Sequence, residues 1–150
     1  MFSTNFQAAM KAGNAYSWSN VTYDSDALDT VLMVCNEHQT LKLYIVRLDF
    51  SADVNTQFVV HAPTYATWAG TAVTGTNLYI GHANVALATA KADETGQATR
   101  GSVIGNGSAL ANVESQKELE AILSYQKAIA VDIVAAATGT LATFIGYYAA

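Results

Sequence analysis

Short segments rich in β-branched and aromatic residues, each ended by turn residues, recur along most of the chain. The strands predicted from them before the C-terminal region span residues 30–36, 41–50, 56–62, 77–81, 84–90 and 98–104. In residues 41–50 apolar side chains fall on both faces, which indicates a strand covered from both sides. Strands that follow one another about every 8 to 12 residues, without long helical stretches between them, are typical of a sandwich or barrel. We therefore predict an all-β fold, an antiparallel β-sandwich.

The C-terminal region resembles a membrane span only in composition. Residues 133–150 contain no charged residue, over a length near the lower limit for crossing a bilayer. However, apolar side chains alternate in residues 129–133 and again in 141–147, and turn residues around Gly139 separate the two runs. This pattern predicts two strands that form a hairpin.

Residues 112–125 and 105–108 do not show a clear strand pattern. Residues 112–125 contain good helix formers and partial helical spacing, which favours a helix, but a strand through residues 121–125 competes with it. Residues 105–108, Gly-Asn-Gly-Ser, are expected to form a flexible turn that ends the preceding strand.

The first thirty residues are rich in Ala, Asn, Ser and aromatic side chains and show no sustained period. A short amphipathic turn is possible before Gly13 and Asn14, which would end it. We predict an extended N-terminal arm over residues 1–30, either a partly ordered terminus or an arm that docks on a partner, followed by one sandwich domain over residues 31–150.

Charge excludes some classes of partner. The chain has 12 acidic and 7 basic residues, a formal net charge of −5, whereas nucleic-acid-binding proteins usually carry a basic surface. We therefore expect no binding to nucleic acid or to an anionic membrane. With a single cysteine, Cys35, the chain forms no disulfide within itself, so packing and hydrogen bonds hold the fold.

Residues that bind metals or act as nucleophiles do not form a recognised pattern. The histidines, His38, His61 and His82, lack the spacing of a metal site, and His61 and His82, which could approach across a sheet, have no third ligand. Cys35 lies in an apolar strand, where we expect it to act as a small hydrophobic residue. The sequence therefore predicts no metal site and no cofactor.

Carboxylate pairs are the remaining candidates for hydrolytic chemistry. Asp49, Asp53 and Asp132 fall near predicted strand ends, where solvated carboxylates are common. Nothing selects a pair among them, so we predict a protein that is not an enzyme, with a sandwich-fold hydrolase as an alternative.

Aromatic side chains are the remaining candidates for binding, because tyrosine and tryptophan combine a large apolar body with one polar group. The same side chains could instead cap the ends of the sandwich core. The residues considered are Tyr65, Trp68, Tyr79, Tyr125, Tyr147 and Tyr148.

A family resemblance extends over residues 41–150. It is carried by residues 43–51 (Leu-Tyr-Ile-Val-Arg-Leu-Asp-Phe-Ser), 58–61, 75–81, 83–86, 130–134 and 144–148. These strand and turn patterns resemble the small single-domain β-sandwich proteins of tailed bacteriophage virions. Such proteins are jelly-roll-like, commonly form trimers, and include capsid decoration (cement) proteins and fibre or collar components.

The resemblance implies a structural protein on the exterior of the capsid. The expected role is a decoration protein that forms a homotrimer on the head lattice and ties neighbouring subunits of the major capsid protein together. The candidate residues for capsid or trimer contact are Phe2, Phe6, Tyr16 and Trp18 in the predicted arm. The alternative is a receptor- or glycan-binding fibre or collar component, with Tyr65, Trp68 and Tyr79 as the ligand-facing aromatic residues.

Overall fold

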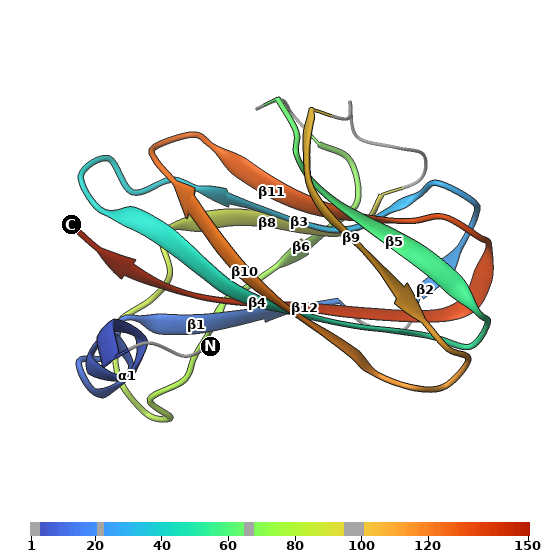
Figure 1. The fold of residues 1–150 in the computed structure, drawn as a ribbon. Helices are drawn as coiled ribbons and strands as arrows, with labels where there is room; N and C mark the ends of the chain where they lie inside the picture. The colour runs from blue at the N-terminus through green and yellow to red at the C-terminus, as the bar shows by residue number, and fades with distance from the viewer. Residues whose placement is uncertain (1–3, 21–22, 65–67, 95–100) are drawn as a thin grey trace.

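Two antiparallel sheets face each other across an apolar core (Figure 1). A computed structural model of the chain describes residues 4–20, 23–64, 68–94 and 101–150. In spatial order the first sheet contains β10 (Ser115–Leu123), β4 (Lys42–Ala52), β12 (Ala137–Ala149), β1 (Ala15–Ser19) and β7 (Thr76–Asn77), while β2 (Tyr23–Ser25) also pairs with β12. The second contains β6 (Thr71–Val73), β8 (Ala88–Glu94), β3 (Thr30–Asn36), β11 (Ala128–Ile133), β5 (Thr56–Ala62) and β9 (Ser102–Ala109). The prediction of an all-β sandwich is confirmed.

Strand β4 illustrates how the core is built. Its inward side chains, including Leu48 and Phe50, are fully buried, and the Phe50 ring meets that of Phe58 on the opposite sheet at 4.7 Å between centroids. On the outer face, Tyr44 and Val46 pack beside helix α1 (Thr4–Lys11). Each large apolar side chain buried in this way stabilises the fold by about 1.5–3 kcal/mol. The expected strand with both faces covered is therefore present where α1 lies over the sheet.

The N-terminal region differs from the predicted arm. Helix α1 ends before Gly13, which has a φ of 76°, and β1 then pairs along its whole length with β12, from Ala15 opposite Tyr147 to Ser19 opposite Thr143. Strand β2 also pairs with β12. Residues 4–20 and 23–25 therefore belong to the sandwich, and no domain boundary falls at residue 30. Strand β1 has only five residues, and Ala15 and Tyr16 are buried side by side, so its sequence does not show the alternation of a strand.

Both predicted C-terminal strands exist, but they do not form a hairpin, and the turn predicted around Gly139 is absent because β12 already begins at Ala137. Strand β11 pairs with β3 and β5 in the second sheet, whereas β12 pairs with β1, β2 and β4 in the first. The residues between them therefore cross from one sheet to the other. Alternation and turn residues predict strands and turns, but they do not tell whether a turn folds back within one sheet.

The other predicted elements agree with the structure to different degrees. Residues 30–36 and 56–62 coincide with β3 and β5, and residues 112–125 contain strand β10, which excludes the helix. Residues 77–81 are not a strand, because β7 ends at Asn77 and a turn follows. Strand β8 begins later than predicted, at residue 88. Among the described residues no helix is long and apolar enough to cross a membrane.

Strand β9 runs through the residues that were expected to form a turn. Gly105 and Gly107 lie inside it, and residues 98–100 of the predicted strand lie outside the described ranges. A Cβ atom at Gly107 would lie 2.1 Å from Cζ of Phe58. Glycine is therefore required here by the close approach of a core ring and not by a turn.

Candidate interaction surfaces

A buried polar cluster lies on the outer face of the second sheet. Nε2 of His61 lies 3.0 Å from Oδ1 of Asp132, and the Thr30 hydroxyl donates a hydrogen bond to the same oxygen at 2.7 Å. Asp132 lies near a strand end as predicted, one residue before the end of β11, but it is fully buried and not in solvent. Its carboxylate is held by buried donors, as a carboxylate away from water must be. The cluster therefore has a structural role.

Cys35 and Trp68 lie on this same outer face, packed with Met33, Ala128 and Ala130. Burial raises the pKa of the Cys35 thiol to about 12, and the nearby Glu37 adds to the rise. A nucleophilic cysteine needs a lowered pKa. Cys35 is therefore an apolar core residue, as predicted.

The aromatic residues proposed as capsid or trimer contacts are interior residues. The rings of Phe6 and Tyr147 meet edge to face at 6.0 Å, and the Tyr16 hydroxyl donates to the carbonyl of Gly13 at 3.3 Å. Trp18 is 1% exposed. These side chains face the sandwich, so they are not available to a partner, and Phe2 lies outside the described residues.

The aromatic residues proposed to face a ligand are not brought together. Trp68 is buried against the second sheet, whereas Tyr79 is half-exposed in the loop that follows β7 of the first sheet. Tyr65 lies outside the described residues. Of the other aromatic candidates, Tyr147 and Tyr148 are buried and Tyr125 is exposed.

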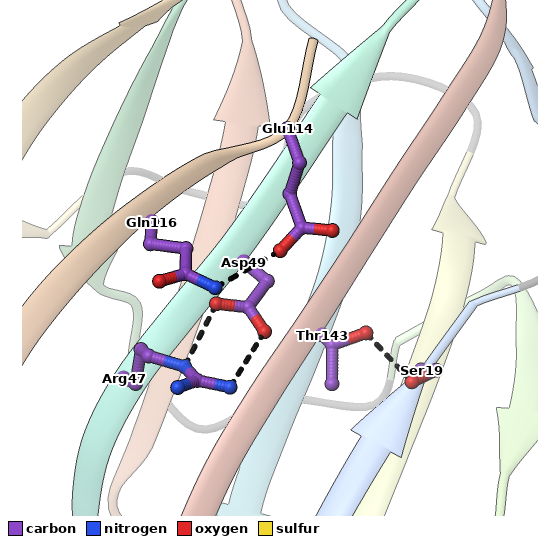
Figure 2. A network of polar contacts seen from close by, with 6 residues as sticks. All are labelled: Ser19, Arg47, Asp49, Glu114, Gln116 and Thr143. Carbon is purple, nitrogen blue, oxygen red and sulfur yellow. Dashed lines mark hydrogen bonds and ion pairs between the residues drawn. The ribbon is translucent and has the colours of Figure 1, made fainter.

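A polar network covers part of the outer face of the first sheet (Figure 2). The guanidinium of Arg47 forms a two-point contact with Asp49, at 2.8 Å from Nε to Oδ1 and 3.0 Å from the terminal nitrogen to Oδ2. Pairing places Gln116 and Thr143 on either side of Asp49. Thr143 then shares a 2.7 Å hydrogen bond with Ser19. The result is a row of polar side chains across four strands.

Two shallow hollows lie along this row. One, of about 280 Å³, is lined by Ser19, Asp49, Glu114 and Thr143 among others, and the next, of about 370 Å³, shares Glu114 and Leu141 with it. Burial raises the pKa of the Asp49 carboxyl, the adjacent Arg47 lowers it in part, and Glu114 contributes to the rise. The hollows offer hydroxyl, amide and carboxylate groups, which suit hydrogen bonds to a neutral ligand.

Residues 78–87, which we call the apolar loop, present large apolar side chains to solvent. Ile80 is 80% exposed and Val85 74%, and Tyr79 and Leu87 are half-exposed. In Figure 1 the loop lies beside α1, and Leu78 packs with the residues of that helix.

Backbone hydrogen bonds give the apolar loop a defined shape. The amide of Leu78 donates to Ala15 at 2.9 Å, and that of His82 donates to Tyr79 at 2.9 Å across a turn at Gly81, whose φ is 87°. The Asn77 side chain donates to the Asn84 carbonyl at 3.1 Å. The exposed apolar groups therefore belong to a structured loop.

A cleft of about 760 Å³ opens beside β10 and is also lined by residues of β5 and β9 in the second sheet. We call it the β10 cleft. Its apolar walls include Pro63, Ile104, Ile122 and Tyr125, and Glu120 and Lys127 supply charges. Ile104, Ile122 and Tyr125 are exposed. The cleft therefore combines a large volume with apolar surface open to solvent.

The turn between β9 and β10, residues 110–114, also carries exposed apolar groups. Leu110 is 66% exposed, and Val113 is exposed beside it. The turn is fixed by hydrogen bonds from the amide of Asn112 to Ala52 at 2.8 Å and from the amide of Val113 to Leu110 at 3.0 Å. Figure 1 shows this turn at the end of the sandwich opposite α1.

These surfaces were not predicted from the sequence. The sequence places Ile80 and Val85 in predicted strands, Val113 contributes to the helical spacing of residues 112–125, and Leu110 belongs to no predicted element. The available signals were Gly81 and Asn84, which interrupt the apolar run, and the absence of charge over residues 78–87.

Comparison of the chain with protein-family models, curated proteins and solved structures gave no match. Within the described ranges, no three His, Cys, Asp or Glu side chains are grouped so as to hold a metal ion.

Proposed function

We propose that the chain is a non-enzymatic structural protein of a virion, a decoration protein that binds the major capsid protein on the outside of the head. The observation that carries this proposal is the exposure of large apolar side chains on the apolar loop, the β10 cleft and the β9–β10 turn. Contiguous exposed apolar surface on a stable domain marks sites of protein association. The resemblance of residues 41–150 to virion sandwich proteins supplies the kind of assembly.

The β9–β10 turn is the surface that we assign to the capsid. It projects from one end of the sandwich, and backbone hydrogen bonds already hold its shape. A turn that is ordered before binding loses little conformational entropy when it docks. Leu110 and Val113 would supply the apolar contact to the capsid surface.

Particle binding by purified protein tests this assignment. Virions stripped of the protein are mixed with the wild-type chain or with the Leu110→Ser/Val113→Ser variant, and bound protein is measured after sedimentation. We expect the variant to bind at least about tenfold more weakly, because it loses apolar contacts at the centre of the interface. The control is Leu28→Asn, which changes an exposed leucine in another loop whose φ of 70° suits asparagine. Equal binding by all three proteins would remove the turn from the interface.

Glycan binding is a second candidate function, and the polar hollows of the first sheet favour it. The hydrogen-bonding groups there face solvent next to the exposed Leu141, whereas Trp68, the aromatic residue first considered, is buried. A glycan array would test it with the Ser19→Ala/Thr143→Val variant, which removes both partners of one hydrogen bond and so perturbs the fold little. Binding by the wild type that the variant loses would favour this function. The absence of wild-type binding would exclude it for the glycans on the array.

A further inference from the structure

Two surfaces of different shape lie at opposite edges of the first sheet. The order of strands is β10, β4, β12, β1 and β7, so the β10 cleft lies at one edge and the apolar loop, which follows β7, lies at the other. The apolar loop projects from the molecule, and the β10 cleft is a hollow. A projecting apolar patch that fits a pocket elsewhere on the same molecule produces head-to-tail contacts between copies.

The composition of the apolar loop suits burial. Residues 78–87 contain no Asp, Glu, Lys or Arg, in a chain whose net charge is −5. Covering Ile80 and Val85 would therefore remove apolar surface from water without desolvating a charged side chain. Interface centres are depleted in charged residues for the same reason.

The volume and the apolar lining of the β10 cleft suit an apolar loop. Its volume of about 760 Å³ lies within the range of about 300–1,000 Å³ typical of binding pockets. Ile104, Ile122 and Pro63 contribute apolar groups to its lining, and Glu120 and Lys127 contribute charged ones. An apolar centre with a polar rim is the usual arrangement of a protein interface.

Direct pairing of two β10 strands is a less favourable way for copies to associate. Antiparallel pairing centred on Leu119 would place Glu118 of one copy opposite Glu120 of the other, and directly opposed like charges are destabilising. Charged side chains on an edge strand commonly prevent such pairing. The cleft beside the strand has no such restriction.

We propose that the apolar loop of one copy of this chain inserts into the β10 cleft of a second copy. The proposal rests on the proposed function and adds to it a contact between copies of the chain. The contact is heterologous, since it joins different surfaces of the two molecules. Repetition of the contact produces a closed ring if the rotation between successive copies returns the last copy to the first, and an open chain if it does not.

Two single substitutions disable the two halves of the contact separately. Ile80→Ser alters the loop, and Ile122→Ser alters the cleft; both side chains are exposed in the single chain, so neither change is expected to unfold it. Thermal melts followed by circular dichroism check that the fold is retained, and Leu28→Asn again serves as the control. The masses of all proteins are measured by sedimentation velocity over a range of concentrations.

We expect the wild type and the control to self-associate, and each single variant to associate at least about tenfold more weakly. A mixture of the two variants should produce a dimer with one copy of each, since the intact loop of Ile122→Ser fits the intact cleft of Ile80→Ser, and no larger species. A monomeric wild type, or variants that assemble like the wild type, would overturn the proposal. A monomeric wild type that still decorates virions would contradict this inference alone, whereas a head-to-tail assembly that never binds virions would contradict the proposed function alone.

Discussion

Replacing Asp132 by alanine removes the carboxylate that holds His61 and Thr30 on the outer face of the second sheet. Both hydrogen bonds to Asp132 lie in the buried interior. Removing one member of a buried polar pair typically costs about 3–5 kcal/mol, because the groups that it bound lose this contact and stay buried. For a domain of 150 residues each kcal/mol lowers the melting temperature by about 2–4 °C, so we expect a decrease of about 6–20 °C.

The matched control replaces these three side chains by apolar residues. Because they then no longer serve as one another's hydrogen-bond partners, the triple variant Thr30→Val/His61→Leu/Asp132→Leu should recover part of the loss. Melting is measured by differential scanning calorimetry on the wild type and on both variants. A decrease below about 2 °C for Asp132→Ala, on the same scale, would refute the structural role of the cluster, as would a triple variant less stable than the single one.

Further predictions concern residues whose roles the structure changes or defines. Trp18→Ala should lower the free energy of unfolding by about 3–5 kcal/mol in urea titrations, because a buried indole leaves a cavity; an unchanged stability would restore Trp18 as a surface contact. Cys35 should react with a thiol reagent at pH 8 only after unfolding, since burial raises its pKa to about 12, and rapid labelling of the native protein would contradict this. The hydrogen bond from Thr138 lowers the pKa of Asp53 in the folded protein. The ionised Asp53 carboxylate therefore stabilises the fold at pH values above the ordinary carboxyl pKa, and this contribution is lost as pH falls through the lowered pKa of the folded state. An NMR titration should show the low pKa in the wild type and a higher one in Thr138→Val, and equal values would refute the assignment.

Strands β3 and β5 were predictable with their ends because apolar, β-branched residues and clear breaks coincide there. The pairing of β11 and β12 with different sheets was not, because residues 137–140, Ala-Thr-Gly-Thr, have the composition of a hairpin turn although they form the start of β12. Gly107 shows a second limit. A glycine that makes room for the Phe58 ring cannot be distinguished in sequence from one that forms a turn.

The candidate surfaces were harder to predict than the fold. An aromatic residue in a segment without a period, such as Trp18, is expected to be exposed, although β1 pairs with β12 and buries it. An isoleucine in an apolar run, such as Ile80, is expected to lie in a strand, although it precedes a turn at Gly81 and is exposed to solvent. Which apolar side chains are exposed depends on contacts between distant segments, and local patterns do not contain these.

Cryo-electron microscopy of the native virion tests the central claim most directly. The account predicts density for this sandwich on the outer surface of the capsid, with the β9–β10 turn against the major capsid protein and the apolar loop of each copy in the β10 cleft of its neighbour. Density confined to the tail, or the absence of the chain from the particle, would contradict it.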